Sequence, residues 1–260
     1  MTGEPRGTEL PAAARRTVLI LGATSSLARG VAAELARRRY ELLLTGRDRE
    51  ELEAVAADLA LRHGVRVESR PFDALALDTH AVFVEDCRKA SEDSLVGVVL
   101  CFGYQGDQAL AEKDIREARR ILDTNLLGAV SILSLFAAYF ESKRDGFLCG
   151  ISSVAGDRGR RSNYIYGAAK AGLTVFLQGL RNRLSSSGVR VITIKPGFVD
   201  TPMTYGRPGL FLVASPEKAG KRIVEAVLQG KDESYVPGFW RLVMFLVRSI
   251  PERIFKRMRW

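Results

Sequence analysis

The sequence predicts an α/β fold in which helices cover both faces of one parallel sheet, a doubly wound arrangement. Short apolar runs alternate with longer helical stretches, and no break in composition interrupts this alternation over residues 17–238. Because strand, helix and strand at this spacing require crossover connections, the strands are expected to be parallel. The 260 residues are 47% hydrophobic and 27% charged, which suffices for the core of a single domain.

The individual elements follow from the apolar periodicity, taken in chain order. Apolar runs predict strands at residues 17–21, 41–45, 65–69, 95–101, 146–151, 189–194 and 234–236. Helical spacing predicts helices at 26–39, 48–61, 115–140, 164–184 and 216–228. Asp48 is a candidate N-cap, because Glu51 follows it three residues later.

Two segments flank the domain, which is predicted at residues 16–238. Residues 1–15 are rich in Gly, Pro and Ala, carry Glu4 and Glu9, and contain no apolar core segment, so we expect a disordered lead and no signal peptide. Residues 239–260, called the tail below, are apolar and basic. They predict two short helices divided by Pro251.

The charge distribution excludes a general nucleic-acid binder. The net charge is +9, and the tail holds six basic residues and one acid, a net charge of +5. The rest of the chain carries no basic stripe, so only the tail indicates an anionic partner, namely a membrane surface. The alternative is that the tail packs on the sheet or on a second subunit. Three scattered cysteines and two histidines predict no disulfide framework and no metal site, and they fit a reducing cytosol.

A turn of small residues follows the first strand. Backbone N–H groups in such a turn, together with the N-terminus of the next helix, can face a pyrophosphate. Gly22 is the one glycine of the usual three, and Ser26 and Ala28 stand at the other two places. The turn therefore predicts a Rossmann-type dinucleotide site, with a serine-capped turn as the alternative. Its candidate residues are Gly22, Thr24, Ser25, Ser26 and Leu27.

The end of the second strand indicates which dinucleotide is bound. An acidic residue there would repel a 2′-phosphate, but this chain has Gly46 and Arg47, which offer space and a guanidinium suited to phosphate. We therefore expect NADP(H) in preference to NAD(H), the alternative being that Arg47 is a solvated loop charge. Asp73, after the third strand, is a weaker candidate for the adenine edge, because lone aspartates in such loops often cap turns.

The candidate catalytic residues lie in the second half of the domain. Tyr166 and Lys170 are four residues apart in a predicted helix and share one face. A nearby ammonium favours the phenolate, so Tyr166 is expected to act as an acid or base near pH 7. Ser153 follows the fifth strand, where a hydroxyl can hydrogen-bond a substrate carbonyl. Asn125 is either a satisfied core amide or part of a proton path.

These motifs, in this order, resemble the short-chain dehydrogenase/reductase family over residues 17 to about 236. The resemblance implies that Tyr166 protonates a carbonyl oxygen while nicotinamide delivers hydride to the carbon. It implies that Lys170 also holds the nicotinamide ribose, that Ser153 orients the carbonyl and that Asn125 anchors a water in the proton relay.

The resemblance also implies further cofactor contacts and a mobile substrate lid over residues 200–214. The contacts are expected at Gly103, Pro196, Gly197, Val199 and Thr201, in addition to Tyr166 and Lys170. Phe102 stands where the family usually has alanine, so this wall of the cofactor site is expected to be reshaped.

Together these features predict an NADP(H)-dependent oxidoreductase that reduces a ketone or oxidises a secondary alcohol. The apolar and basic tail resembles that of decaprenylphosphoryl-keto-ribose reductases, which implies a lipid-linked keto-sugar as substrate. A fatty-acyl, sterol or generic carbonyl reductase is the alternative, and the intact Ser153, Tyr166 and Lys170 disfavour a non-catalytic NADP(H) sensor. We expect a homodimer or homotetramer in the cytoplasm, peripheral on the inner membrane face.

Overall fold

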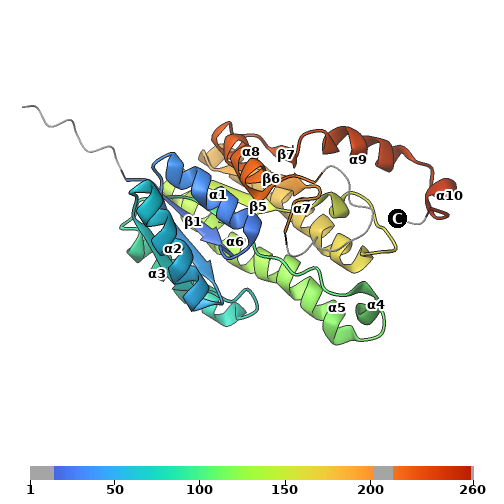
Figure 1. The fold of residues 1–260 in the computed structure, drawn as a ribbon, viewed down its shortest axis with the longest axis horizontal. Coiled ribbons are helices and arrows are strands. Elements are labelled where there is room, and N and C mark those ends of the chain that lie inside the picture. The colour runs from blue at the N-terminus through green and yellow to red at the C-terminus, as the bar shows by residue number, and fades with distance from the viewer. Residues whose placement is uncertain (1–14, 202–212, 259–260) are drawn as a thin grey trace, which may run out of the picture.

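The computed structural model describes residues 15–201 and 213–258. Within these residues, seven parallel strands form one sheet in the order β3-β2-β1-β4-β5-β6-β7. Helices cover both faces of the sheet (Figure 1). The predicted doubly wound, Rossmann-type α/β domain with a helical tail is therefore confirmed. The predicted lead lies almost wholly outside the described residues, as do 202–212 of the predicted lid.

The strand order reverses at β1, which pairs with β2 on one side and with β4 on the other. In such sheets the ligand crevice opens at this switch point, beyond the carboxyl ends of the strands. The strands are β1 (Thr17–Leu21), β2 (Glu41–Gly46), β3 (Val67–Pro71), β4 (Leu95–Leu100), β5 (Phe147–Ile151), β6 (Arg190–Pro196) and β7 (Glu233–Val236). The third strand begins two residues later than predicted, because Val67 is the residue that pairs with Leu42 of β2.

The five predicted helices are all present, with ends that differ from the predicted ones by at most three residues and with the long helix divided into two, and the two tail helices were also expected. The helices are α1 (Ser26–Arg37), α2 (Arg49–His63), α3 (His80–Ala90), α4 (Gln108–Ala111), α5 (Ile115–Leu122), α6 (Gly128–Lys143), α7 (Tyr164–Leu184), α8 (Pro216–Leu228), α9 (Trp240–Ser249) and α10 (Glu252–Phe255). The sequence did not predict α3 and α4. Their weak apolar pattern explains this: α3 buries only His80 and Cys87, and α4 buries only Ala111. The N-cap prediction is confirmed, since Glu51 N donates to Asp48 Oδ1 at 3.0 Å.

The long helix predicted at 115–140 extends to Lys143 and is not uniformly α-helical. A π-helical turn, Asp123–Leu127, separates α5 from α6. Such turns are rare and occur often at functional sites. By length and composition the helix from Ile115 to Lys143 is apolar enough to cross a membrane. Phe136 and Phe140 are nevertheless fully buried against the sheet, as in the core helix of a folded domain.

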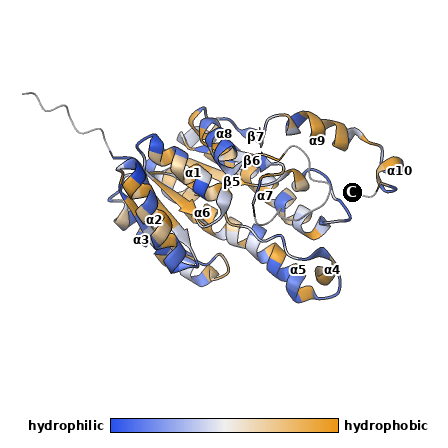
Figure 2. Ribbon diagram, in the orientation of Figure 1, coloured by the Kyte–Doolittle hydropathy of each residue, from blue (hydrophilic) through white to orange (hydrophobic). Residues whose placement is uncertain are grey.

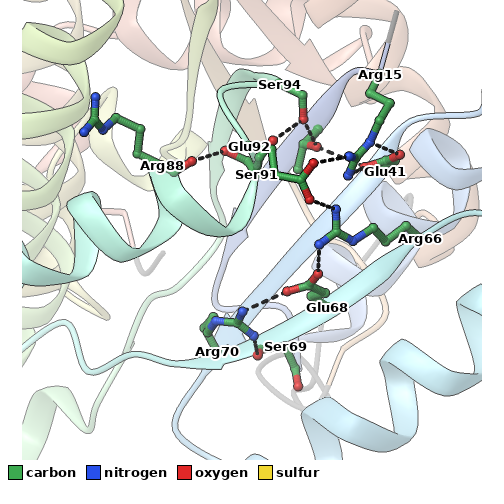
Figure 3. Close-up of polar contacts among 11 residues, drawn as sticks. Arg15, Glu41, Arg66, Glu68, Ser69, Arg70, Arg88, Ser91, Glu92 and Ser94 are labelled. Carbon is green, nitrogen blue, oxygen red and sulfur yellow. Dashed lines mark hydrogen bonds and ion pairs between the residues drawn. The ribbon is translucent and has the colours of Figure 1, made fainter. Parts of the chain in front are cut away.

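The amino ends of the strands carry a network of exposed ion pairs. Arg15 contacts Glu41 and Glu92, and Glu92 also accepts from Arg66 at 3.0 Å (Figure 3). Exposed pairs of this kind contribute little to stability. This edge is opposite to the carboxyl ends of the strands, where the candidate catalytic residues gather.

Candidate active site

Three of the four candidate catalytic residues, Asn125, Tyr166 and Lys170, lie close together at the carboxyl edge of the sheet. Lys170 Nζ lies 5.7 Å from the centre of the Tyr166 ring, one turn away on α7. A Cβ atom added at Gly103 would lie 2.9 Å from Asn125 Oδ1 and 3.5 Å from Lys170 Nζ. Gly103 therefore lies directly beside both side chains, and a Cβ there would be too close to the Asn125 amide while only touching Lys170 Nζ.

The loop after β5, residues 152–158, lies directly on α7, and we call it the serine loop. Ser152 Oγ donates to Lys170 O at 2.9 Å and lies 2.7 Å from Thr174 Oγ1. Glycines permit the close approach: a Cβ at Gly156 would lie 2.7 Å from Ala171 N, and one at Gly167 would lie 2.9 Å from Ala155 O. These contacts fix Ser153 against the helix that carries Tyr166 and Lys170.

Ser153 has an extended backbone, and its hydroxyl caps the short turn that follows. Ala155 N donates to Ser153 Oγ at 3.1 Å. Among residues 15–201 and 213–258 no acceptor receives the Ser153 hydroxyl hydrogen. The hydrogen bond from Ala155 N therefore holds Ser153 Oγ in place, and the hydroxyl hydrogen of Ser153 can be donated to a bound molecule.

Lys170 is a buried cation. Its side chain is 3% exposed, and Nζ donates to Ile151 O at 3.0 Å. Burial lowers the pKa of Lys170 to about 8, and the nearby Cys101 thiol opposes this shift. At neutral pH the ammonium remains mostly protonated in a site of low dielectric. Its field on the neighbouring phenol is therefore stronger than it would be in water.

Asn125 is a fully satisfied amide, 1% exposed, in the π-helical turn. Its Nδ2 donates to Ile121 O at 2.8 Å and to Tyr104 O at 2.5 Å, while Oδ1 accepts from Tyr104 N at 3.2 Å. These bonds are those of a satisfied core amide, and the part of Asn125 in a proton path stays a prediction. Asn125 thereby holds the segment after β4 in place beside Lys170.

The turn after β1 has the geometry that the sequence predicts. Gly22 has φ +84°, and a Cβ there would lie 2.7 Å from the backbone nitrogen of Phe102. Gly22 N and Ala23 N both donate to Thr45 O, at 2.9 and 2.8 Å. Ser25 is exposed and caps α1, accepting from Ala28 N at 3.2 Å. The Phe102 ring packs into the core, 5.8 Å from the Phe72 ring.

Three charged residues flank this turn. Arg47 is exposed, and among the described residues no carboxylate lies within 4 Å of its guanidinium. Asp73 Oδ1 accepts from Leu75 N at 3.0 Å, which is the turn-capping role. The sequence did not predict a role for Arg29 of α1, whose Nε donates to Thr24 O at 3.2 Å. A single arginine on the outer face of a helix carries no signal that would have singled it out.

Comparisons with known proteins show the family of this chain. The family model for short chain dehydrogenase matches residues 16–208. The chain belongs to the short-chain dehydrogenase family. It is 37% identical over 244 residues to an uncharacterized oxidoreductase of Streptomyces coelicolor, covering 94% of this chain and 96% of that protein.

Solved structures show the same fold. A short-chain dehydrogenase from Sphingobium yanoikuyae in complex with NADPH has a TM-score of 0.77 at 24% identity, covering 91% of this chain and 97% of that chain. An actinorhodin polyketide ketoreductase with NADPH has a TM-score of 0.77 at 20% identity, covering 86% and 97%.

In this short-chain dehydrogenase the loop after β6 meets the tail, which the sequence did not predict. Pro196 ends β6, and Val199 forms an isolated bridge with Ala214 that closes the base of the predicted lid. A Cβ added at Gly197 would collide with the Trp240 indole of α9. Thr201 is half-buried and is the last described residue before 202–212. The tail is therefore a direct neighbour of the loop for which cofactor contacts are predicted.

Proposed function

We propose that this short-chain dehydrogenase is an NADP(H)-dependent carbonyl reductase, acting on a ketone or, in reverse, on a secondary alcohol. One observation carries the proposal: a buried Lys170 ammonium lies beside Tyr166, and the Ser153 loop packs on the same helix. In this proposal an acid, a cation and a hydroxyl donor act together on one carbonyl group at the carboxyl edge of the sheet. This is the set that carbonyl reduction requires.

In the proposed mechanism each side chain has a separate task. Ser153 donates its hydroxyl hydrogen to the carbonyl oxygen and orients it, because Ala155 N fixes the serine oxygen. Tyr166 transfers its proton to the same oxygen as negative charge develops there. Lys170 stabilises the resulting tyrosinate, and the main chain of Ile151 keeps its ammonium in place. The nicotinamide supplies the hydride when it is bound.

The turn after β1 fits a dinucleotide. Gly22 allows the tight turn against Phe102, and α1 presents its N-terminus just after this turn, where a pyrophosphate would be favoured. The exposed Arg47 guanidinium supports NADP(H), and both solved structures cited above contain NADPH. The residues proposed to hold the cofactor are Gly22, Thr24, Ser25, Ser26, Leu27, Arg47, Asp73, Gly103, Tyr166, Lys170, Pro196, Gly197, Val199 and Thr201.

The experiment that tests this function follows NADPH oxidation with a panel of soluble ketones. A reductase oxidises NADPH only when a ketone is present. A protein that binds NADPH by calorimetry but oxidises it with no ketone in the panel, and with no cell lipid extract, would instead be an NADP(H) sensor.

We further propose a substrate carried by a lipid, taken from an anionic membrane surface. Trp240, Met244 and Val247 of α9 are buried against the domain, so the packing alternative describes the inner face of the tail. The outer face is different: Leu242 is 65%, Phe245 66% and Leu246 57% exposed. Figure 2 shows hydrophobic residues along α9 and α10, at the far end of the molecule from the amino ends of the strands.

The tail also carries exposed basic residues, namely Arg241, Arg248, Arg253, Lys256 and Arg257. Each basic residue near an anionic leaflet contributes about 1 kcal/mol, and inserted aromatics add to this. Full-length protein should therefore sediment with anionic vesicles at low salt, whereas a Phe245→Ser/Leu246→Ser variant should stay in the supernatant. Wild-type protein that stays in the supernatant as well would contradict the membrane proposal.

The chemistry of the substrate can be identified by label transfer. Cell lipid extract incubated with the enzyme and NADPH carrying deuterium at the hydride position should yield a labelled lipid-linked sugar. Label in a fatty-acyl chain, a sterol or a small carbonyl compound would favour the alternative reductases.

A homodimer or homotetramer through the two long helices is the proposed assembly. Leu127, in the π-helical turn, is 49% exposed and Val175 of α7 is 66% exposed, which leaves apolar surface for a second copy. Light scattering of the purified protein should give a mass of two or four chains.

A further inference from the structure

Arg158, in the serine loop, binds the C-terminal end of α9. Its Nη1 donates to Val247 O at 2.5 Å, to Ile250 O at 2.7 Å and, at the longer distance of 3.3 Å, to Arg248 O. The side chain is 14% exposed, although arginines are mostly solvated. The last carbonyls of a helix lack partners within the helix, so a cation there supplies donors and balances the helix dipole.

The same guanidinium also holds α10. Its Nη2 lies 3.0 Å from Glu252 Oε2, and its Cζ lies 3.8 Å from the centre of the Phe255 ring. One side chain therefore contacts both tail helices through hydrogen bonds, an ion pair and a cation–π contact. A planar guanidinium with five N–H donors can satisfy these partners together, whereas a lysine ammonium cannot.

The residue before Arg158 fixes the serine loop to the sheet. Asp157 accepts from Lys195 Nζ of β6 at 2.8 Å and from Tyr235 Oη of β7 at 2.8 Å. Lys195 also pairs with Glu233 at 2.9 Å. Asp157 and Lys195 are almost fully buried, so this anchor is rigid. Residues 157 and 158 thus join the serine loop to the sheet on one side and to the tail on the other.

The inner face of α9 spans the loops that follow β5 and β6. Val154, next to Ser153, belongs to one buried cluster with Trp240, Met244 and Val247. The Trp240 ring meets Phe198 edge-on, with centroids 5.2 Å apart. A movement of α9 would therefore displace both loops that border the proposed active site.

We propose that Arg158 is a positioning residue that holds the tail against the serine loop, so that the tail supports one side of the proposed active site. Its contacts with Val247 O, Ile250 O, Glu252 and Phe255 together are called the Arg158 lock below. When the contacts of the Arg158 lock are formed, α9 stays packed against Val154, and this packing holds the neighbouring Ser153 at the substrate carbonyl. The effect on turnover rests on the proposed function, but the lock itself does not. Without the guanidinium the carbonyls of residues 247 and 250 lose these side-chain donors, and α9 loses its link to α10 and to the serine loop through Arg158.

The test compares Arg158→Met, Arg158→Lys and the control Arg253→Met, an exposed tail arginine. The chain has two tryptophans, Trp240 and Trp260, so a Trp260→Phe background makes emission report on Trp240 alone. Trp240 is 2% exposed, and its emission should shift to the red in Arg158→Met as the indole meets water. Arg253→Met should keep the wild-type emission. An unshifted spectrum in Arg158→Met would overturn the lock.

Turnover then tests the effect on Ser153. Misplacing a catalytic group by about 1 Å reduces rates by about 100-fold, so kcat of Arg158→Met should fall by about 10- to 100-fold while the Kd for NADPH stays close to wild type. The kcat of Arg158→Lys should lie between those of the wild type and Arg158→Met, because lysine restores the positive charge but not the planar set of N–H donors. A red-shifted Arg158→Met with wild-type kcat would refute the positioning role. If the wild type reduces no ketone, the proposed function fails, and the emission shift still decides whether the lock exists.

Discussion

Reversing the charge of Arg47 should change which nicotinamide dinucleotide the protein prefers. Arg47 follows β2, whose Thr45 carbonyl accepts from both Gly22 N and Ala23 N, so the arginine lies near the turn after β1, where we propose that the cofactor phosphates bind. Its guanidinium is exposed, and none of the described carboxylates lies within 4 Å. Within residues 15–201 and 213–258, therefore, no carboxylate already neutralises this charge.

The expected magnitude follows from this exposure. Hydrogen bonds to a charged group contribute about 1.5–3 kcal/mol. An aspartate at this position adds repulsion of about 1 kcal/mol for each phosphate charge at 4 Å in water. Arg47→Asp should therefore weaken NADPH binding relative to NADH by about 3 kcal/mol, which is roughly 100-fold. Arg47→Gln removes only the attraction and should give a smaller loss.

Calorimetric titration of NADPH and NADH into wild type and variants measures this ratio. The matched control is Arg49→Asp, because Arg49 is also exposed but pairs with Glu53 on α2. It should leave the ratio unchanged. If Arg47→Asp keeps the wild-type preference for NADPH, or if the wild type binds both equally, the assignment of Arg47 to the 2′-phosphate is wrong.

Two further predictions concern the buried polar groups. The pKa of Lys170 is lowered from 10.5 to about 8, so between these values the unfolded chain binds more protons than the folded protein. The free energy of unfolding of the wild type, relative to that of Lys170→Met, should therefore rise with pH across this window by up to about 1.4 kcal/mol per pH unit. Denaturant melts of both proteins at pH 7 to 10 measure this difference, and a difference that does not change with pH would contradict the burial argument. Asn125→Ala removes three hydrogen bonds of a buried amide, to Tyr104 N, Tyr104 O and Ile121 O, at about 0.5–1.5 kcal/mol each, and should lower the free energy of unfolding by about 3 kcal/mol, whereas the exposed Asn182→Ala should change it by less than about 0.5 kcal/mol. Equal effects of the two asparagine variants in the same melts would contradict the role of Asn125.

Local signals explain why much of the fold could be predicted. The apolar run of β1, the serine-capped start of α1 and the N-cap at Asp48 act within a few residues of each other. The spacing of Tyr166 and Lys170 likewise becomes a shared helix face without help from the rest of the chain. Such features depend on backbone geometry that neighbouring residues determine.

Long-range features could not be predicted in the same way. The π-helical turn around Asn125 depends on the partners that the amide finds at Tyr104, 21 residues away. The contact of Trp240 with Gly197, and the binding of tail carbonyls by Arg158, join segments that only the folded sheet brings together. In the sequence, Arg158 is one charge among several in a polar loop. Its function appears only when the far end of the chain lies beside it.

The sequence also left two alternatives for the tail, packing on the domain or binding to a membrane surface. In the structure the inner face of α9 packs on the domain, and its outer face is exposed. Burial of Met244 agrees with packing on the domain, while exposure of Phe245 leaves the outer face for another partner. Composition alone cannot separate these faces, because α9 is apolar nearly all round.

Ketone reduction by Tyr166→Phe tests the central proposal most directly. This variant loses only the phenolic hydroxyl, so the proton donor is removed while the ring keeps its place on α7 beside Lys170. In single-turnover experiments with NADPH and a ketone that the wild type reduces, hydride transfer should slow by about 10²- to 10⁴-fold, with the Kd for NADPH nearly unchanged. A wild-type rate of reduction in Tyr166→Phe would contradict the account.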